Sequence, residues 1–176
     1  MLLLLRALAG RLDEARETLP DFERYFRFEE PWTASLGEAR LTLAAALVVL
    51  HEKDLARSLY EPLKEWTESS EYVLTGLASI PQLVTRVLGM LADICDAPGE
   101  AQAYFDTAIN QAREIGIRSE LAEACYWCAG SLLRNDTAAN NERANDLLAE
   151  ACAIWEQAGM PAHVKRASRL ASASGR

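Results

Sequence analysis

One pattern occurs four times along this chain: an alanine followed by apolar residues four and seven positions later. The four copies are Ala15-x3-Leu19-x2-Phe22, Ala56-x3-Tyr60-x2-Leu63, Ala101-x3-Phe105-x2-Ala108 and Ala144-x3-Leu148-x2-Ala151. These positions share one face of an α-helix, and a small residue there lets the helix approach its neighbour closely. The alanines recur at intervals of 41, 45 and 43 residues, which is typical of stacked helical hairpins. The sequence therefore predicts an array of such hairpins.

Each copy of the pattern follows another amphipathic stretch, which we interpret as the first helix of its hairpin. Glycine and proline are sparse, at nine and six of 176 residues, which argues against the many turns of a β-sandwich or barrel. We therefore expect an all-α fold, a helical-hairpin repeat array in a single domain over residues 1–176. Its expected units are about 1–30, 31–75, 76–116 and 117–160, followed by a solvent-facing capping helix at 161–173.

Proline, glycine and turn residues indicate where these helices begin and end. The expected helix starts are Pro31, Pro81 and the turn at 96–99, with Asp96 as a candidate N-cap; the expected ends are His51, Thr67, Gly116 and Gly159. Pro62 should bend the helix over 53–67 or end it early, because proline lacks an amide hydrogen. Residues 68–80 are expected to form a long connection.

The first helix of the third unit carries Leu88-Gly89-x2-Ala92, and Gly89 stands twelve residues before Ala101. These two motifs resemble the tetratricopeptide repeat, in which Leu-Gly-x2-Tyr in the first helix precedes Ala-x3-Phe-x2-Ala in the second. The second unit keeps the same offset, between Ala44 and Ala56. The resemblance implies a right-handed superhelix whose first helices line a concave, partner-binding face.

A longer series of motifs runs from Leu59-Tyr60-Glu61 through Val84-x-Arg86-x-Leu88-Gly89 to Gly159-Met160. It is similar to the C-terminal helical-repeat region of bacterial signalling proteins that combine an ATPase module with a class III adenylate/guanylate cyclase domain or a LuxR-type DNA-binding domain. The similarity covers about residues 8–170 and lapses over 62–75. Because the chain has no phosphate-binding G-x-x-x-x-G-K-[ST] motif, the similarity implies an excised or separately encoded tail, or a protein that has lost its enzyme domains.

The charge of the chain constrains its partners. It has 18 Lys and Arg against 26 Asp and Glu, a net charge of −8, which disfavours nucleic acid and anionic membranes. Residues 161–176 are the exception, with four basic residues and no acid. The longest apolar run, 43–50, is too short to cross a bilayer, and Met1–Leu5 is too short for a signal peptide. We therefore expect a cytoplasmic protein without disulfides.

Residue types that usually act in catalysis or metal binding are few in this chain, and their spacing does not match known catalytic or metal-binding motifs. His51-Glu52 begins like the zinc-protease motif H-E-x-x-H, but Leu55 stands where the second histidine would be. Cys125 and Cys128 form a C-x-x-C motif on the apolar stripe of a helix, which favours core packing over zinc binding. The same packing role is expected for Cys95, Cys152, Trp32, Trp66, Trp127 and Trp155. We expect no catalytic residue, no metal and no cofactor.

The leading hypothesis is a regulatory module that binds a protein or peptide segment, or domains of its own parent protein, on the concave face. The residues expected to line this groove are Arg86, Met90 and Asp93 in the third unit and Glu123, Tyr126 and Arg134 in the fourth. Arginine and tyrosine on one face suit an acidic peptide. The alternative is a small-molecule sensor of a LuxR-type regulator, which needs an enclosed apolar cavity. We also expect a homodimer through the clipped first helix, Leu2 to Leu8.

Overall fold

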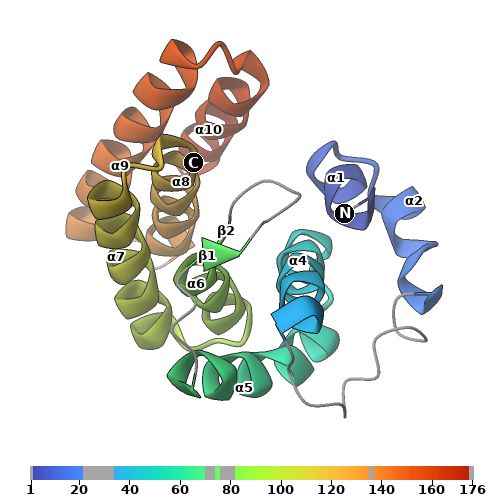
Figure 1. The fold of residues 1–176 in the computed structure, drawn as a ribbon. Helices are drawn as coiled ribbons and strands as arrows, with labels where there is room; N and C mark the ends of the chain where they lie inside the picture. Colours follow the sequence, from blue (N-terminus) through green and yellow to red (C-terminus); the bar gives the residue numbers. More distant parts are fainter. Residues whose placement is uncertain (1, 22–33, 70–73, 76–81, 135–136, 175–176) are drawn as a thin grey trace. The chain divides into compact units, whose positions relative to one another are not determined.

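A computed structural model describes residues 2–21, 34–69, 74–75, 82–134 and 137–174, and nearly all of these are helical (Figure 1). The strands among them are β1 (Leu74–Thr75) and β2 (Gln82–Leu83), a two-residue antiparallel pair. The expected all-α fold class is confirmed. The chain divides into two compact units, Met1–Ala97 (unit 1) and Pro98–Arg176 (unit 2). This boundary lies inside the third expected hairpin, 76–116, so the two helices of that hairpin belong to different units.

Unit 1 is built around one buried helix, α4 (Ala34–Leu50). Residues 41–48 of α4 are all buried, which fits a stretch that is almost entirely apolar. The other helices of this unit are α1 (Leu2–Leu8), α2 (Leu12–Arg16), α5 (Lys53–Ser69) and α6 (Val84–Ile94), and all four contact α4. Helix α5 comes close to α4 at Gly37, where a β-carbon would lie 3.0 Å from Cζ2 of Trp66. The absence of a side chain at Gly37 therefore gives the Trp66 ring its place in the core.

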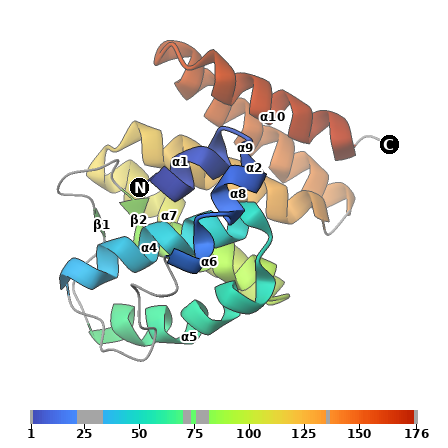
Figure 2. The same ribbon diagram turned by 90° about the vertical axis from the view of Figure 1, so that its right-hand side faces the viewer.

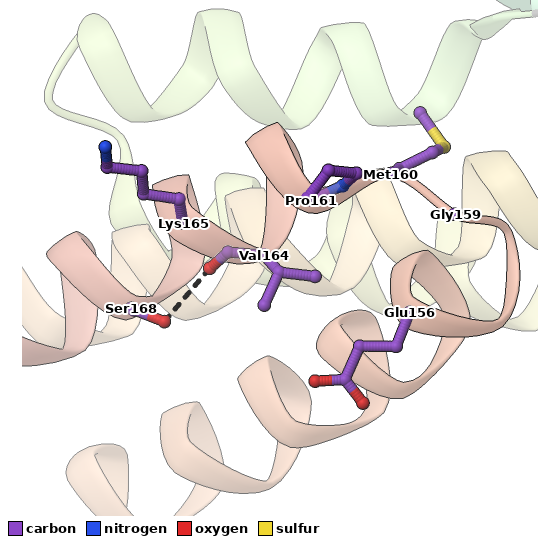
Figure 3. A pocket seen from close by; sticks show the side chains of 7 residues that line it. All are labelled: Glu156, Gly159, Met160, Pro161, Val164, Lys165 and Ser168. Atoms are coloured by element: carbon purple, nitrogen blue, oxygen red, sulfur yellow. Dashed lines mark hydrogen bonds between the residues drawn. The ribbon is translucent and has the colours of Figure 1, made fainter.

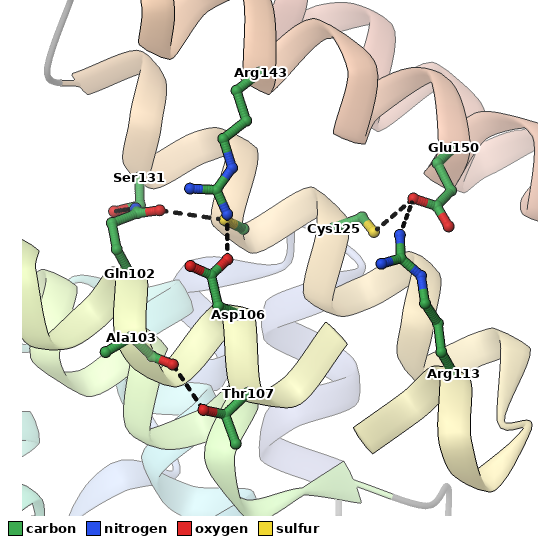
Figure 4. A network of polar contacts seen from close by, with 10 residues as sticks. Gln102, Ala103, Asp106, Thr107, Arg113, Cys125, Ser131, Arg143 and Glu150 are labelled. Carbon is green, nitrogen blue, oxygen red and sulfur yellow. Dashed lines mark hydrogen bonds and ion pairs between the residues drawn. The ribbon is translucent and has the colours of Figure 1, made fainter. Parts of the chain in front are cut away.

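Unit 2 holds four consecutive helices, α7 (Pro98–Ile115), α8 (Arg118–Arg134), α9 (Ala138–Gln157) and α10 (Pro161–Ser174) (Figure 2). Helix α8 packs against each of the other three. Two ion pairs join α7 to α9 (Figure 4). Asp106 of α7 pairs with Arg143 of α9. Arg113 of α7 pairs with Glu150 of α9, with Nη2 of the arginine 2.7 Å from Oε2 of the glutamate. Both pairs span 37 residues, so α7 and α9 run parallel in a fixed register.

Five helices of the described chain end in the same way. Helices α1, α4, α6, α7 and α9 are closed by a residue with positive φ, between 59° and 82°: Gly10, His51, Asp96, Gly116 and Gly159 respectively. The next amide then bonds to the carbonyl five positions earlier, as from Met160 to Trp155 at 2.8 Å. The expected ends at Gly116 and Gly159 are confirmed. The N-cap role expected for Asp96 is wrong, because this residue closes α6 in a left-handed conformation and its carboxylate pairs with Lys53.

The remaining boundaries differ from expectation mainly at proline. Helix α5 continues through Pro62 to Ser69, so of the two expected outcomes, a bend or an early end, the early end is wrong. Buried side chains on both sides of the proline, Leu59 and Leu63 among them, offset the lost backbone hydrogen bond. Helix α6 begins at Val84, after β2. The starts expected at Pro31 and Pro81 lie outside the described residues, and α10 confirms the helix expected at 161–173.

The repeated alanines share one structural role. Ala15, Ala56, Ala101 and Ala144 all have 0 % of their surface exposed. The other described members of the pattern are buried as well: Leu19, Tyr60, Leu63, Phe105, Ala108, Leu148 and Ala151. Phe22 lies outside the described residues. The pattern therefore marks the packed face of one helix in each expected unit.

Candidate functional site

The groove residues expected in the third unit lie on α6 of unit 1. Arg86 is only 6 % exposed and Met90 only 1 %, so neither lines an open surface, and this part of the expected groove is misplaced. Arg86 Nη1 lies 3.3 Å from the Met90 sulfur, and both α4 and α5 pack against α6. Asp93, one turn further along α6, is half-buried. The burial of Arg86 includes its guanidinium group, whose Nη1 meets the Met90 sulfur inside the packed helices.

The groove residues expected in the fourth unit lie on α8 of unit 2, and α10 contacts two of them. Arg166 Nη2 of α10 lies 2.6 Å from Oε1 of Glu123, and its guanidinium carbon lies 4.1 Å from the centre of the Tyr126 ring. Charge-assisted hydrogen bonds and cation–π contacts of this kind are among the stronger polar interactions in proteins. Glu123 and Tyr126 therefore serve first as the docking place of the chain's own last helix.

The α10 contact extends to a buried tryptophan of α9. Trp155 is 1 % exposed, and its ring centre lies 5.9 Å from that of Tyr126 and 5.3 Å from that of His163. The packing role expected for Trp155 is confirmed. Burial, and next the charge of Arg166, lower the pKa of His163 below its ordinary value, while Glu123 acts in the opposite direction. The imidazole is therefore neutral at pH 7.

The sequence contained a signal for this cluster. Glu123 and Arg166 are 43 residues apart, the same interval as that between Ala101 and Ala144. In a parallel stack of helices, residues separated by one repeat lie at similar positions on neighbouring helices. An acid and a base at that separation therefore predict an ion pair between α8 and α10.

Further along α8, a smaller set of side chains gathers around Gly130. A β-carbon at Gly130 would lie 3.6 Å from Cδ2 of Leu170 and 3.9 Å from Nη1 of Arg134. Trp127 precedes Gly130 by one turn, is half-buried, and meets the Tyr126 ring edge-on at a centre distance of 5.6 Å. Arg134 is exposed. We name Trp127, Arg134 and Leu170 the Gly130 patch, a surface that combines an aromatic ring, an aliphatic side chain and a guanidinium group.

The two central cysteines are core residues. Cys125 and Cys128 on α8 are fully buried, and burial raises the pKa of each thiol to about 12. The Cys128 sulfur lies 3.4 Å from Gln102 Oε1. The Cys125 sulfur lies 3.7 Å from Oε2 of Glu150, which also pairs with Arg113 (Figure 4). Cys95 and Cys152 differ, because both are only half-buried. Among the described residues, no group of three or more His, Cys, Asp or Glu side chains is placed to hold a metal ion.

This difference in burial predicts a difference in thiol reactivity. In the folded protein at mildly alkaline pH, Cys95 and Cys152 should react with an aromatic disulfide reagent. Cys125 and Cys128 should react at least about a hundredfold more slowly, because their thiols are protonated and reachable only through local opening. The release of chromophore, followed before and after adding denaturant, measures both classes. Four equally fast thiols in the folded protein would contradict the placement of α8.

Comparison with known protein families, curated proteins and solved structures finds no match to this chain. The bacterial signalling resemblance therefore stays a prediction from sequence. Within the residues that the structure describes, no helix has the length and apolar character needed to cross a membrane.

Proposed function

We propose that this chain is a non-enzymatic interaction module, a tetratricopeptide-like array of helical hairpins that binds a segment of a partner protein. Three observations support the array: the four buried repeat motifs, the shared mode of helix closure, and the parallel register of α7 and α9. In such arrays each repeat buries its apolar face against its neighbours and leaves an extended surface for binding.

The observation that carries the binding proposal is the Gly130 patch. Aromatic and arginine side chains are enriched where proteins bind one another, because they combine a large contact area with directional polar groups. Trp127 and Leu170 are half-buried apolar side chains. Arg134 is exposed as a residue, but burial lowers the pKa of its guanidinium, which lies near Gly130. A segment with one apolar side chain followed by a carboxylate fits these three groups.

The charge of α10 favours the same kind of segment. Its basic residues are Lys165, Arg166 and Arg169, and it has no acidic residue. Arg166 is used internally by Glu123, while Lys165 and Arg169 are exposed. The partner segment proposed here is therefore acidic, with at least one large apolar residue.

A peptide library displayed on phage and selected on the full chain tests this proposal. We expect enrichment of acidic sequences that contain Leu, Phe or Trp. The affinity of one selected peptide is then measured by calorimetry for the parent, for Arg134→Glu and for Arg57→Glu, a matched charge reversal at an exposed position of α5. Arg134→Glu should weaken binding at least about tenfold, as loss of a charge-assisted hydrogen bond does.

Arg57→Glu should leave the affinity unchanged, and circular dichroism checks that both variants keep the helical content of the parent. If both variants weakened peptide binding equally, the peptide would be attracted by the overall charge of the protein. That result would contradict a binding site at the Gly130 patch. A selection that enriches no acidic sequence would contradict the proposed partner class.

A further inference from the structure

The face of α10 that packs on the rest of unit 2 carries a histidine beside two opposite charges. Nε2 of His163 lies 3.8 Å from Oε1 of Glu123 on α8. Arg166, three residues further along α10, places Nη2 2.6 Å from the same oxygen. Two side chains of α10 therefore share one carboxylate oxygen of α8, and of these two only the arginine is permanently charged.

Each helix packed on α10 presents a group to His163. On α9 this group is the uncharged Trp155 ring, 5.3 Å away from ring centre to ring centre. Among the described residues, the charged groups that act on the imidazole are Glu123 of α8 and Arg166 of α10 itself. Tyr126 of α8 stays neutral in acidic solution, because burial raises the pKa of its phenol. A proton on His163 thus places a second cation beside Arg166 in a half-buried site.

The opposite face of α10 is incompletely packed. A groove of about 540 Å³ lies between the first half of α10 and the end of α9 (Figure 3). The α10 residues that line it follow one another at intervals of three, one and three positions on one side of the helix: Pro161, Val164, Lys165 and Ser168. Ala167, in contrast, is buried on the side of His163 and Arg166. Docking of α10 therefore depends on the face that carries the histidine.

We propose that protonation of His163 loosens the docking of α10 on α8 and α9, so that mild acid opens this end of unit 2. The neutral ring packs on Trp155, whereas an imidazolium is repelled by Arg166 and competes with it for Oε1 of Glu123. Burial, and next the charge of Arg166, outweigh Glu123 and lower the pKa of His163 in the docked helix. The stability that the neutral ring contributes is therefore complete above the ordinary histidine pKa of about 6.5, and it is lost as the pH falls through the lower pKa of the docked state.

Loosening of α10 also takes Leu170 away from the Gly130 patch. Leu170 belongs to α10, and its Cδ2 lies 3.6 Å from the position of a β-carbon at Gly130. The patch then loses its aliphatic side chain. Mild acid should therefore weaken binding of the acidic segment, a step that rests on the function proposed above, whereas the pH dependence of α10 docking does not.

Hydrogen–deuterium exchange of the full chain, followed by mass spectrometry at about pH 7.5 and about pH 5.5, tests the proposal; both values lie above the ordinary carboxyl pKa. His163→Gln keeps a neutral amide near the place of Nε2, and comparison at one pH cancels the intrinsic pH dependence of exchange. Relative to this variant, the α10 amides of the parent should exchange severalfold faster at the lower pH and equally fast at the higher pH. The control is His51→Asn at the other histidine, which is exposed with φ 59°, a conformation that asparagine tolerates; it should behave like the parent.

Proton NMR of the two imidazole rings of the parent measures the pKa of His163 directly, and the two variants assign the signals. A pKa above the ordinary histidine value, or α10 exchange that keeps the same ratio to His163→Gln at both pH values, would overturn the proposal. Calorimetry with a selected acidic peptide completes the test, and the parent should lose more affinity in acid than His163→Gln. Equal losses, found while α10 opens in acid, would overturn the role of Leu170 in peptide binding and leave the pH-dependent docking established.

Discussion

Replacing Trp155 by alanine should lower the free energy of unfolding of unit 2 by about 3–5 kcal/mol, the usual cost of removing a large buried aromatic side chain. Trp155 is 1 % exposed and touches three groups that hold α10 in place, the side chains of Tyr126, His163 and Arg166. The truncation leaves a cavity and removes the ring with which Arg166 makes a cation–π contact. Urea unfolding followed by circular dichroism measures the change.

Trp127→Ala is the matched control for this prediction. Trp127 is half-buried and its ring meets that of Tyr126 edge-on, so its removal deletes less buried area than that of Trp155. We expect its cost to be about half that of Trp155→Ala or less, in proportion to the apolar surface that returns to water. Equal costs for the two truncations would contradict the burial of Trp155 between α8 and α10.

Enlarging a repeated alanine should also destabilise the fold strongly. Ala101→Leu inserts a larger side chain where helix α7 meets its neighbour, and overpacking of this kind costs about 1–3 kcal/mol. Ala103→Leu makes the same chemical change two residues away on the exposed face of α7, where the expected change is within about 0.5 kcal/mol. Urea midpoints of the two variants give the comparison directly. Two variants of equal stability would show that the small residue at Ala101 is not needed for close helix packing.

The repeat could be predicted from sequence because its signals are local. The spacing of Ala101, Phe105 and Ala108 selects one face of one helix, and burial of that face follows from amphipathicity alone. Gly116 and Gly159 mark helix ends because a left-handed residue there needs no side chain. A helix end at His51 and a turn at 96–99 were expected as well, but the residue types there did not predict the left-handed conformation of His51 and Asp96.

The partner-binding groove expected on Arg86, Met90 and their neighbours could not be placed correctly from the sequence, for a geometrical reason. Whether a residue one position off the packing stripe faces solvent depends on which further helices cover that side. Arg86 and Met90 are covered within unit 1, and Glu123 meets α10. Arg134 is exposed because it lies at the last residue of α8. An arginine also gives no clear signal of exposure, since its stem packs among apolar residues while its charge is satisfied elsewhere.

The boundary between the two units was likewise not visible in the repeat pattern. The intervals of 41, 45 and 43 residues continue across it without interruption, and the turn at 95–98 resembles the other helix ends. The division into two compact units depends on contacts between residues far apart in the sequence. The periodicity of apolar residues within a single helix carries no information about such contacts.

The claim that an acidic partner segment binds the Gly130 patch is tested most directly by heteronuclear NMR of the tryptophan indole groups. A selected acidic peptide is titrated into the full chain, and the indole N–H signals are assigned by single Trp→Phe substitutions. The signal of Trp127, half-buried one helical turn before Gly130, should shift in a saturable way, while that of Trp66, buried in unit 1, should stay in place. A saturable shift of Trp66 alone, or no shift of Trp127 when calorimetry shows binding, would contradict the account.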